Sequence, residues 1–231
     1  GSGFLQPGPG WGGSCLPKDT AALVHSARSQ GVAMAEVEAA RTTNAAQPAR
    51  IASALQHSMG CPLEGCRITV FGLTFKAATS DTRDSPALAV CAHLRSEGAH
   101  VYGYDPQLPA IDTQVLQSAG VSAVDDPYRA AKSADAVLLL TEWPQFADLD
   151  WAAIAEHAPG AVVVDTRNLL GPTARELLAA AGLPSGRRWP GSRPAGRSRR
   201  CGRRTVRRTG RAAPDPRRPS ARGASRDPSR E

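Results

Sequence analysis

The chain has 231 residues, 41% of them hydrophobic, and a net charge of +7 at neutral pH, which suits one ordinary domain with extensions. The charge is uneven, because residues 187–231 hold 16 arginines against three acidic side chains and so carry +13, which leaves −6 for the rest. The sequence has no run of about 18 uncharged apolar residues and no basic region followed by an apolar core, so it predicts a cytoplasmic protein without a membrane span.

The first 18 residues are rich in glycine and irregular. The following residues, to about 30, are typical of a helix, with Asp19 or Thr20 as the N-cap and Gly31 as the terminator. A longer, alanine-rich helical stretch extends from about 33 to 59. Pro48 lies inside it and predicts a kink or break, since proline lacks the backbone N–H and clashes with the preceding turn.

From residue 65 the pattern changes to alternating strands and helices. Strands are expected at 67–72, 99–105, 121–124, 135–141 and 160–166, and helices at about 85–97, 127–133, 149–157 and 172–181. The strands are continuous apolar runs, which is typical of a parallel sheet covered by helices on both faces. The predicted fold class is therefore α/β, with a central helical segment followed by a Rossmann-like, doubly wound parallel-sheet domain.

This pattern divides the chain into three parts: a cysteine loop with central helices over 1–59, the sheet domain over 60–183, and a tail over 184–231. The tail has almost no aliphatic residues, which predicts disorder. Its arginines would attract phosphate polymers, but it carries no RNA-binding signature, so any nucleic-acid binding would be non-specific. A solvated tail, or translation of a GC-rich gene in another reading frame, is the preferred explanation of this composition.

The five cysteines are odd in number and lack the paired spacing of a disulfide framework or a zinc knuckle. Cys61 and Cys66 are separated by four residues and form no zinc-binding pattern with a histidine. Reduced thiols without a metal site are therefore expected.

Cys15 stands in the string GPGWGGSCLPKD (8–19). Backbone amides of a glycine-rich turn before a helix stabilise a thiolate and offer donors to an oxyanion. The glycines would also let the backbone close around a ligand, with Trp11 as a wall of the pocket. A nucleophilic cysteine is one interpretation; a small buried apolar side chain is the other.

The longer string FLQPGPGWGGSCLPKD (4–19) resembles the cysteine-loop signature of the UDP-glucose/GDP-mannose dehydrogenase family. A second string, VFGLTFKAATSDTRDSPA (70–87), looks like the family's opening strand and loop of the nucleotide-sugar-binding domain. Further matches are YDP (104–106), TEWPQF (141–146) and VVDTRNLL (163–170). The resemblance covers residues 1 to about 182 and is strongest to the UDP-glucose branch. It implies NAD-dependent oxidation of UDP-glucose to UDP-glucuronate for polysaccharide synthesis, by a homodimer.

The resemblance also implies roles for single residues. Cys15 would attack the C6 aldehyde, giving a thiohemiacetal and then a thioester, and Asp19 would orient or deprotonate the hydrolytic water. Lys18 and Arg83 would contact NAD. The residues implied to contact the nucleotide sugar are Phe4, Leu5, Gln6, Gly8, Gly10, Gly12, Phe75, Lys76 and Arg167.

Several of these side chains have structural alternatives. Lys76 and Arg83 stand in a polar loop, where a charge is often simply solvated. Asp105 ends a strand, but GLTFKA (72–77) is not a dinucleotide-binding fingerprint, so Asp105 is expected to cap the turn before Pro106. Trp143 and Phe146 are expected to be packing residues.

The sequence departs from the family in lacking the G-x-G-x-x-G motif of an N-terminal NAD-binding domain. It is therefore expected to begin within the catalytic domain and to represent a gene fragment. A thiol without a bound nicotinamide has no hydride acceptor. The alternative function is thus a catalytically incomplete module that binds a nucleotide sugar and dimerises. The choice between UDP-glucose and GDP-mannose stays open.

Overall fold

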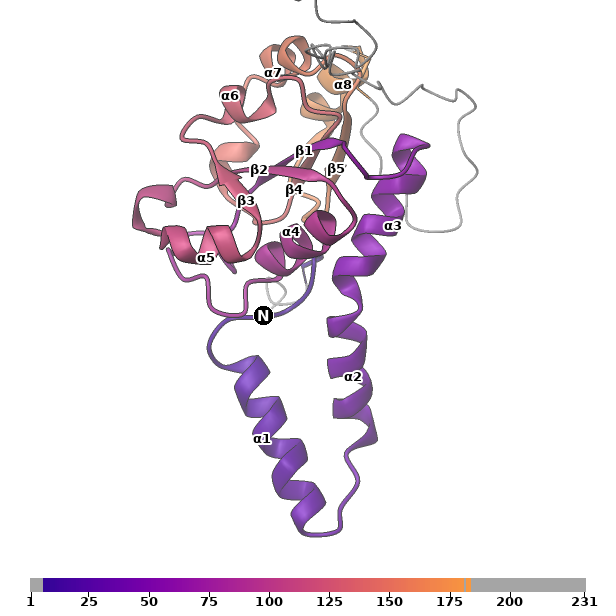
Figure 1. The fold of residues 1–231 in the computed structure, drawn as a ribbon, viewed down its shortest axis with the longest axis vertical. Helices are drawn as coiled ribbons and strands as arrows, with labels where there is room; N and C mark the ends of the chain where they lie inside the picture. Colours follow the sequence, from indigo (N-terminus) through magenta and orange to yellow (C-terminus); the bar gives the residue numbers. More distant parts are fainter. Residues whose placement is uncertain (1–5, 181, 184–231) are drawn as a thin grey trace, which may run out of the picture. The chain divides into compact units, whose positions relative to one another are not determined.

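The computed structural model of the chain describes residues 6–180 and 182–183 (Figure 1). Phe4, Leu5 and the predicted tail 184–231 lie outside the described residues. Within the described part of the chain, no helix is both long enough and apolar enough to cross a membrane.

Helix α1 (Leu16–Ser29) begins earlier than the sequence predicted. Cys15 is its N-cap, and the Asp19 N–H donates to the Cys15 carbonyl at 2.8 Å. The prediction of Asp19 or Thr20 as the N-cap was therefore wrong, because Pro17, with its φ fixed near the helical value, lies in the first turn. Gly31 is confirmed as the terminator and has a φ of 71°.

Helices α2 (Ala35–Ala45) and α3 (Gln47–Met59) replace the single long stretch, with the break at Ala46. The predicted interruption is confirmed, and Pro48 lies in the first turn of α3, where a missing N–H is harmless. None of the residues of α2 is buried, whereas α3 buries four. Figure 1 shows α1 folding back along α2, so these two helices form a hairpin, while α3 belongs to the core.

The sheet has five parallel strands in the order β3-β2-β1-β4-β5, which confirms the predicted doubly wound class. The strands are β1 (Arg67–Phe71), β2 (His100–Tyr104), β3 (Val121–Ala123), β4 (Ala136–Leu139) and β5 (Val162–Asp165). The predicted helices appear as α4 (Pro86–Ser96), α6 (Pro127–Ala131), α7 (Trp151–His157) and α8 (Pro172–Ala180). Three short elements were not predicted: α5 (Thr113–Ser118) and the 3-10 helices η2 (Leu108–Ala110) and η3 (Pro144–Phe146).

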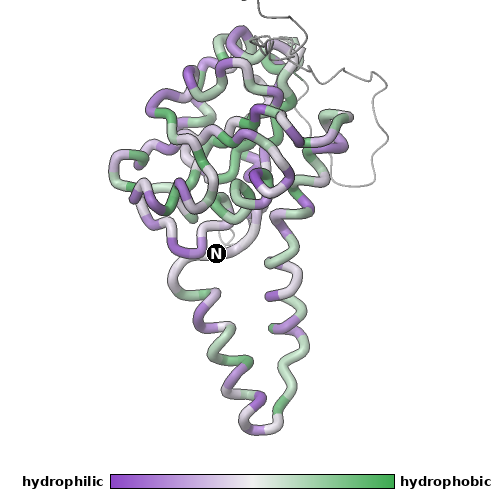
Figure 2. The backbone as a smooth tube through the Cα atoms, in the orientation of Figure 1, coloured by the Kyte–Doolittle hydropathy of each residue, from purple (hydrophilic) through white to green (hydrophobic). Residues whose placement is uncertain are grey.

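The two faces of the sheet are buried by different helices, as successive residues of β4 show. Ala136 and Leu138 pack in a cluster with side chains of α3, α4 and α5. Val137 and Leu139 pack in a second cluster with side chains of α6, α7 and α8. Burial on both faces explains the uninterrupted apolar runs, and Figure 2 shows this hydrophobic interior beside the mixed colouring of the hairpin.

Gly72 follows β1 at a crowded turn. Its φ is 90°, and a Cβ there would overlap the Thr141 side chain and lie 2.7 Å from the Thr141 backbone nitrogen. We expect Gly72→Ala to lower the free energy of unfolding by about 2–3 kcal/mol, measured by urea denaturation. Gly171→Ala is the control, because nothing lies within 4 Å of that position. Equal losses in the two variants would contradict this account.

Candidate functional site

The glycine-rich loop before α1 lies against the carboxyl ends of the central strands, the edge where open α/β sheets bind ligands. It meets two segments there. One follows β5 and carries Arg167, and the other follows β1 and covers residues 75–86. The structure therefore brings the predicted residues of three distant segments together.

Arg167 lies directly beneath the loop. A Cβ on Gly8 would be 2.5 Å from Arg167 Nη1, so the loop backbone passes close over the guanidinium. Arg167 Nε donates to the Leu140 carbonyl at 2.9 Å, and Nη2 lies 3.1 Å from Glu142 Oε2 in an ion pair. Burial lowers the pKa of Arg167, and the Glu142 charge opposes that shift. The Arg167 guanidinium, fixed by Leu140 and Glu142, therefore faces the glycine-rich loop. The sequence did not predict Glu142 as its partner.

Two glycines of the loop pack against the segment after β1. A Cβ on Gly12 would overlap the Asp84 carbonyl oxygen, and one on Gly13 would lie 2.8 Å from the Phe75 ring. Gly13 has a φ of 81°, and its N–H donates to the Arg83 carbonyl at 3.1 Å. Larger side chains at these two positions would separate the loop from this segment.

The charged groups of that segment are engaged with their own neighbours. Arg83 Nη2 donates to Asp81 Oδ2 at 2.7 Å, and Arg83 Nε donates to Oδ1 at 2.9 Å. The hydrogen bonds from the Arg83 side chain, and then from its backbone N–H, lower the pKa of Asp81 to about 2. Lys76 Nζ is 5.3 Å from the centre of the Phe75 ring. Both cations are exposed, so they remain accessible to an anionic ligand.

Cys15 is exposed at the start of α1, with its Sγ 3.7 Å from Ser14 Oγ. Lys18 Nζ donates to Asp19 Oδ1 at 2.6 Å. This hydrogen bond is the main cause that raises the pKa of Lys18, and a Cys15 thiolate acts in the same direction. A Cys15 thiolate also contributes to the raised pKa of Arg83, after the larger effect of Asp81. Cys15 is therefore an accessible thiol that interacts electrostatically with two cations.

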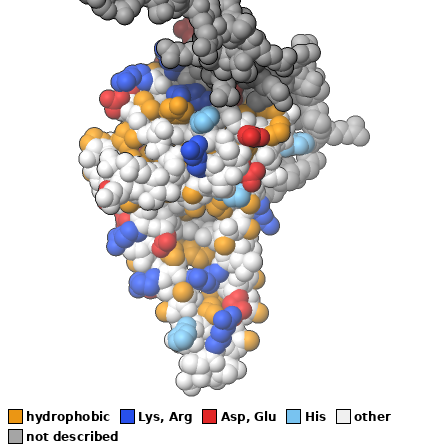
Figure 3. Space-filling view, in the orientation of Figure 1, with side chains coloured by type: hydrophobic (Ala, Val, Ile, Leu, Met, Phe, Trp, Pro, Cys, Tyr) orange, Lys and Arg blue, Asp and Glu red, His pale blue; other side chains and the backbone are white. Residues whose placement is uncertain are grey.

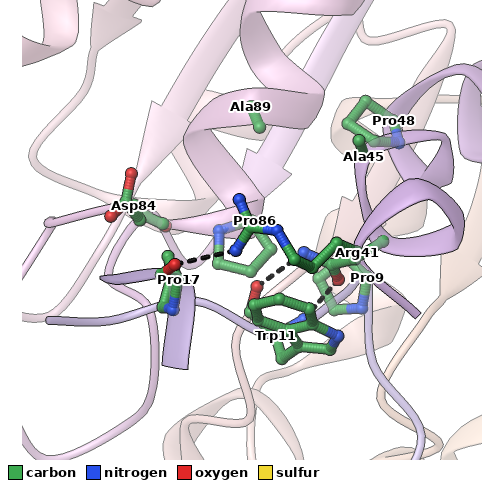
Figure 4. Close-up of a pocket in the computed structure, with 11 residues that line it drawn as sticks. Pro9, Trp11, Pro17, Arg41, Ala45, Pro48, Asp84, Pro86 and Ala89 are labelled. Atoms are coloured by element: carbon green, nitrogen blue, oxygen red, sulfur yellow. Dashed lines mark hydrogen bonds between the residues drawn. The ribbon is translucent and has the colours of Figure 1, made fainter. Parts of the chain in front are cut away.

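Two functional candidates on α2 were not predicted. Asn44 Oδ1 accepts from the Trp11 N–H at 2.8 Å, and Asn44 Nδ2 donates to the Trp11 carbonyl at 3.0 Å. Arg41 Nη1 donates to the Pro17 carbonyl at 2.8 Å and to Thr20 Oγ1 at 2.6 Å. The sequence gives no local sign of these long-range bonds. Figure 4 shows Arg41 beside Pro17 and Trp11.

A cavity of about 280 Å³ lies between the loop, α2 and the start of α4 (Figure 4). Its lining consists of Pro9, Trp11, Pro17, Arg41, Asn44, Ala45, Pro48, Asp84, Ser85, Pro86 and Ala89. Trp11 walls this cavity, whose lining does not include Phe75 or Arg167. The cavity therefore borders the loop that is predicted to line the nucleotide sugar, through Pro9 and Trp11, but not the predicted contacts of the sheet domain.

The turn after β1 is closed by Asp105, which is 1% exposed. Asp105 Oδ2 accepts from the backbone N–H groups of Leu73 at 2.7 Å and Thr74 at 3.1 Å. The same oxygen accepts from Trp143 Nε1 at 3.2 Å. Asp105 is therefore a structural residue, as predicted, and Trp143 adds a hydrogen bond to its packing role. In dinucleotide-binding sheets this turn approaches a pyrophosphate, whereas here a carboxylate takes the N–H groups, so the turn does not fit NAD.

The strand order and the cysteine loop at the carboxyl edge of the sheet define a doubly wound α/β protein with a candidate ligand site at that edge. Residues 1–46 match the central domain of the UDP-glucose/GDP-mannose dehydrogenase family, and residues 69–172 match its UDP binding domain. The chain belongs to the UDP-glucose/GDP-mannose dehydrogenase family.

Individual relatives agree with this assignment. The UDP-glucose 6-dehydrogenase of Rhizobium meliloti is 40% identical over 169 residues, which cover 73% of this chain and 38% of the relative. UDP-glucose 6-dehydrogenase TuaD of Bacillus subtilis is 37% identical over 179 residues, which cover 78% of this chain and 38% of the relative. A solved UDP-glucose dehydrogenase from Pyrobaculum islandicum is 35% identical, with a TM-score of 0.62, covering 73% of this chain and 37% of that one. The chain thus spans about 38% of the length of these curated relatives.

Proposed function

We propose that this chain supplies the cysteine loop and the nucleotide-sugar-binding domain of a UDP-glucose 6-dehydrogenase. The observation that carries the proposal is the packing of the Cys15 loop against Arg167 and Phe75 at the carboxyl edge of the sheet. The names of the most similar relatives support UDP-glucose as the substrate. Arg167 would hold the diphosphate or a sugar oxygen, and the loop from Gln6 to Gly12 would lie along the nucleotide sugar.

In this proposal the Cys15 thiolate adds to the C6 aldehyde, forming a C–S bond and a thiohemiacetal. Backbone N–H groups at the start of α1 would donate to the developing oxyanion. Loss of a hydride from C6 leaves a thioester. Asp19 then orients a water that attacks the thioester carbon, the C–S bond breaks, and the thiolate leaves. The alcohol loses four electrons as two hydrides, and water supplies the second carboxylate oxygen.

NAD, when bound, accepts the hydride in each of the two oxidations. The exposed side chains of Lys18 and Arg83 are cations that suit its diphosphate, and Cys15 interacts electrostatically with both. The turn after β1 is excluded as a dinucleotide site, because Asp105 takes its backbone N–H groups. The proposed NAD contacts of this chain are therefore Lys18 and Arg83, near Cys15, and not the turn after β1.

Protection of Cys15 from alkylation tests the proposal. We expect the 6-aldehyde of UDP-glucose to slow iodoacetamide labelling of Cys15 at least about tenfold while labelling of Cys61 is unchanged, as followed by peptide mass spectrometry. UDP alone is the control for simple occlusion. Equal labelling with and without the aldehyde, together with no UDP binding by calorimetry, would refute the proposal. NADH formation from UDP-glucose then distinguishes a chain that turns over from one that only binds.

The hairpin of α1 and α2 favours a second role for the chain, as a module that binds a nucleotide sugar and dimerises. Helix α1 buries only Val24, while Leu23 is 47% exposed and Val32 between the helices is 55% exposed. Figure 3 shows hydrophobic side chains at the surface of the hairpin, interspersed with charged ones. We propose that a second copy of the chain covers this surface. Sedimentation velocity should give a dimer that Leu23→Glu converts to a monomer, and a monomeric wild-type chain would refute this role.

A further inference from the structure

The cysteine loop is anchored on both sides of Cys15 by a single helix. Asn44 binds the backbone of Trp11, which precedes the cysteine, through both of its amide groups. Arg41 binds the carbonyl of Pro17, which follows the cysteine, and the Thr20 hydroxyl of α1. Arg41 and Asn44 are three residues apart on α2, so both side chains project from one face of that helix.

The other contacts of this part of the loop lie on the side of the sheet domain, where Gly12 and Gly13 pack against Asp84 and Phe75. A cavity of about 280 Å³ lies behind Trp11, so close packing does not hold that side. The Cys15 side chain makes no capping hydrogen bond to the first turn of α1. The one backbone bond that ties the loop to the sheet domain between Gly10 and Cys15 is the bond from the Gly13 N–H to the Arg83 carbonyl, among the described residues.

Gly10 also depends on Asn44. A Cβ on Gly10 would lie 2.8 Å from Asn44 Oδ1, and its φ is 141°. The backbone at Gly10 therefore lies too close to the Asn44 side chain for any residue larger than glycine. This contact sets the distance between the loop and α2. The Asn44 side chain thus contacts Gly10 and makes both hydrogen bonds to Trp11.

We propose that Asn44 and Arg41 are positioning residues that hold Cys15 at the N-terminus of α1, where it is exposed and interacts electrostatically with Lys18 and Arg83. Neither residue touches the reacting atoms. They act through the backbone of Trp11 and Pro17. This inference rests on the proposed role of Cys15 as the nucleophile, but it concerns the thiol before any substrate is bound.

The test is the iodoacetamide labelling rate of Cys15 in the full chain, resolved by peptide mass spectrometry. At pH 7 we expect Asn44→Ala and Arg41→Ala each to slow the labelling about fivefold, with Asn44→Asp intermediate because it keeps the acceptor for the Trp11 N–H. At about pH 10 ordinary thiols are ionised, so the rates should agree with the wild type. Hydrogen exchange of the Trp11 amide should be faster in Asn44→Ala.

Matched controls separate positioning from a general loss of structure. Thr42→Ala removes an exposed side chain of α2 that bonds only the Glu38 carbonyl, and Arg50→Ala removes an exposed arginine of α3. Both should label like the wild type. Labelling of folded Asn44→Ala and Arg41→Ala within twofold of the wild type at pH 7, or an equal slowing at both pH values, would overturn the proposal. The assay contains neither UDP-glucose nor NAD, so a failure to bind UDP would refute the proposed function without affecting this comparison.

Discussion

Asp105→Ala is expected to lower the free energy of unfolding by about 3–5 kcal/mol. The substitution leaves the N–H groups of Leu73 and Thr74 and the indole N–H of Trp143 without their shared acceptor in the interior. Each buried donor without a partner costs about 1–3 kcal/mol. Urea denaturation, followed by far-ultraviolet circular dichroism, measures the loss.

Asp105→Asn and Asp148→Ala complete this experiment. The amide in Asp105→Asn keeps an oxygen acceptor but cannot carry the charge that strengthens these bonds, so we expect an intermediate loss of about 2 kcal/mol. Asp148 is exposed, and its replacement by alanine should change stability by less than about 0.5 kcal/mol. A loss below about 1 kcal/mol in Asp105→Ala would mean that water or a neighbouring group replaces the carboxylate.

Arg167→Ala is expected to weaken binding of UDP about hundredfold. The Arg167 side chain is only 13% exposed, and the Leu140 carbonyl and the Glu142 carboxylate hold its guanidinium beside Gly8. A partly buried, oriented guanidinium can bind a diphosphate through two parallel hydrogen bonds, which are about twice as strong as neutral ones. Isothermal titration calorimetry with UDP measures the change.

Arg167→Lys keeps the charge without the fork of donors, and we expect about a tenfold loss. Arg129→Ala removes an exposed arginine that pairs with Asp125, and it should bind UDP like the wild type. Since Arg167 also bonds the protein, the folded fraction of each variant has to be measured by urea denaturation. A folded Arg167→Ala variant with unchanged affinity for UDP would remove Arg167 from the proposed site.

Most of the sheet domain was predictable because its strands are buried on both faces. An apolar run such as 136–139 has one interpretation when helical segments alternate with it. The start of α1 was harder, since Asp19 and Pro17 are both good first-turn signals and only the fold shows that the helix begins at Leu16. Helix α5 has six residues, too few for a helical period to be recognised.

The candidate site was predictable where short motifs carry it, as at Cys15, Phe75 and Arg167. The glycines of the loop have a physical explanation only in the structure, where Gly12 and Gly13 touch Asp84 and Phe75. Contacts between distant segments leave no local pattern, so Asn44, Arg41 and Glu142 could not be predicted. The domain boundaries, the cytoplasmic location and the roles of single site residues stay predictions.

The break at Ala46 separates α2, none of whose residues is buried, from α3, which buries four residues. Arg41 and Asn44 lie about 4.5 Å apart along α2. Their side chains bond the backbone of Trp11, before the cysteine, and of Pro17, after it. The loop that precedes Cys15 and the helix that follows it thus share one support, and that support stands outside the hydrophobic core.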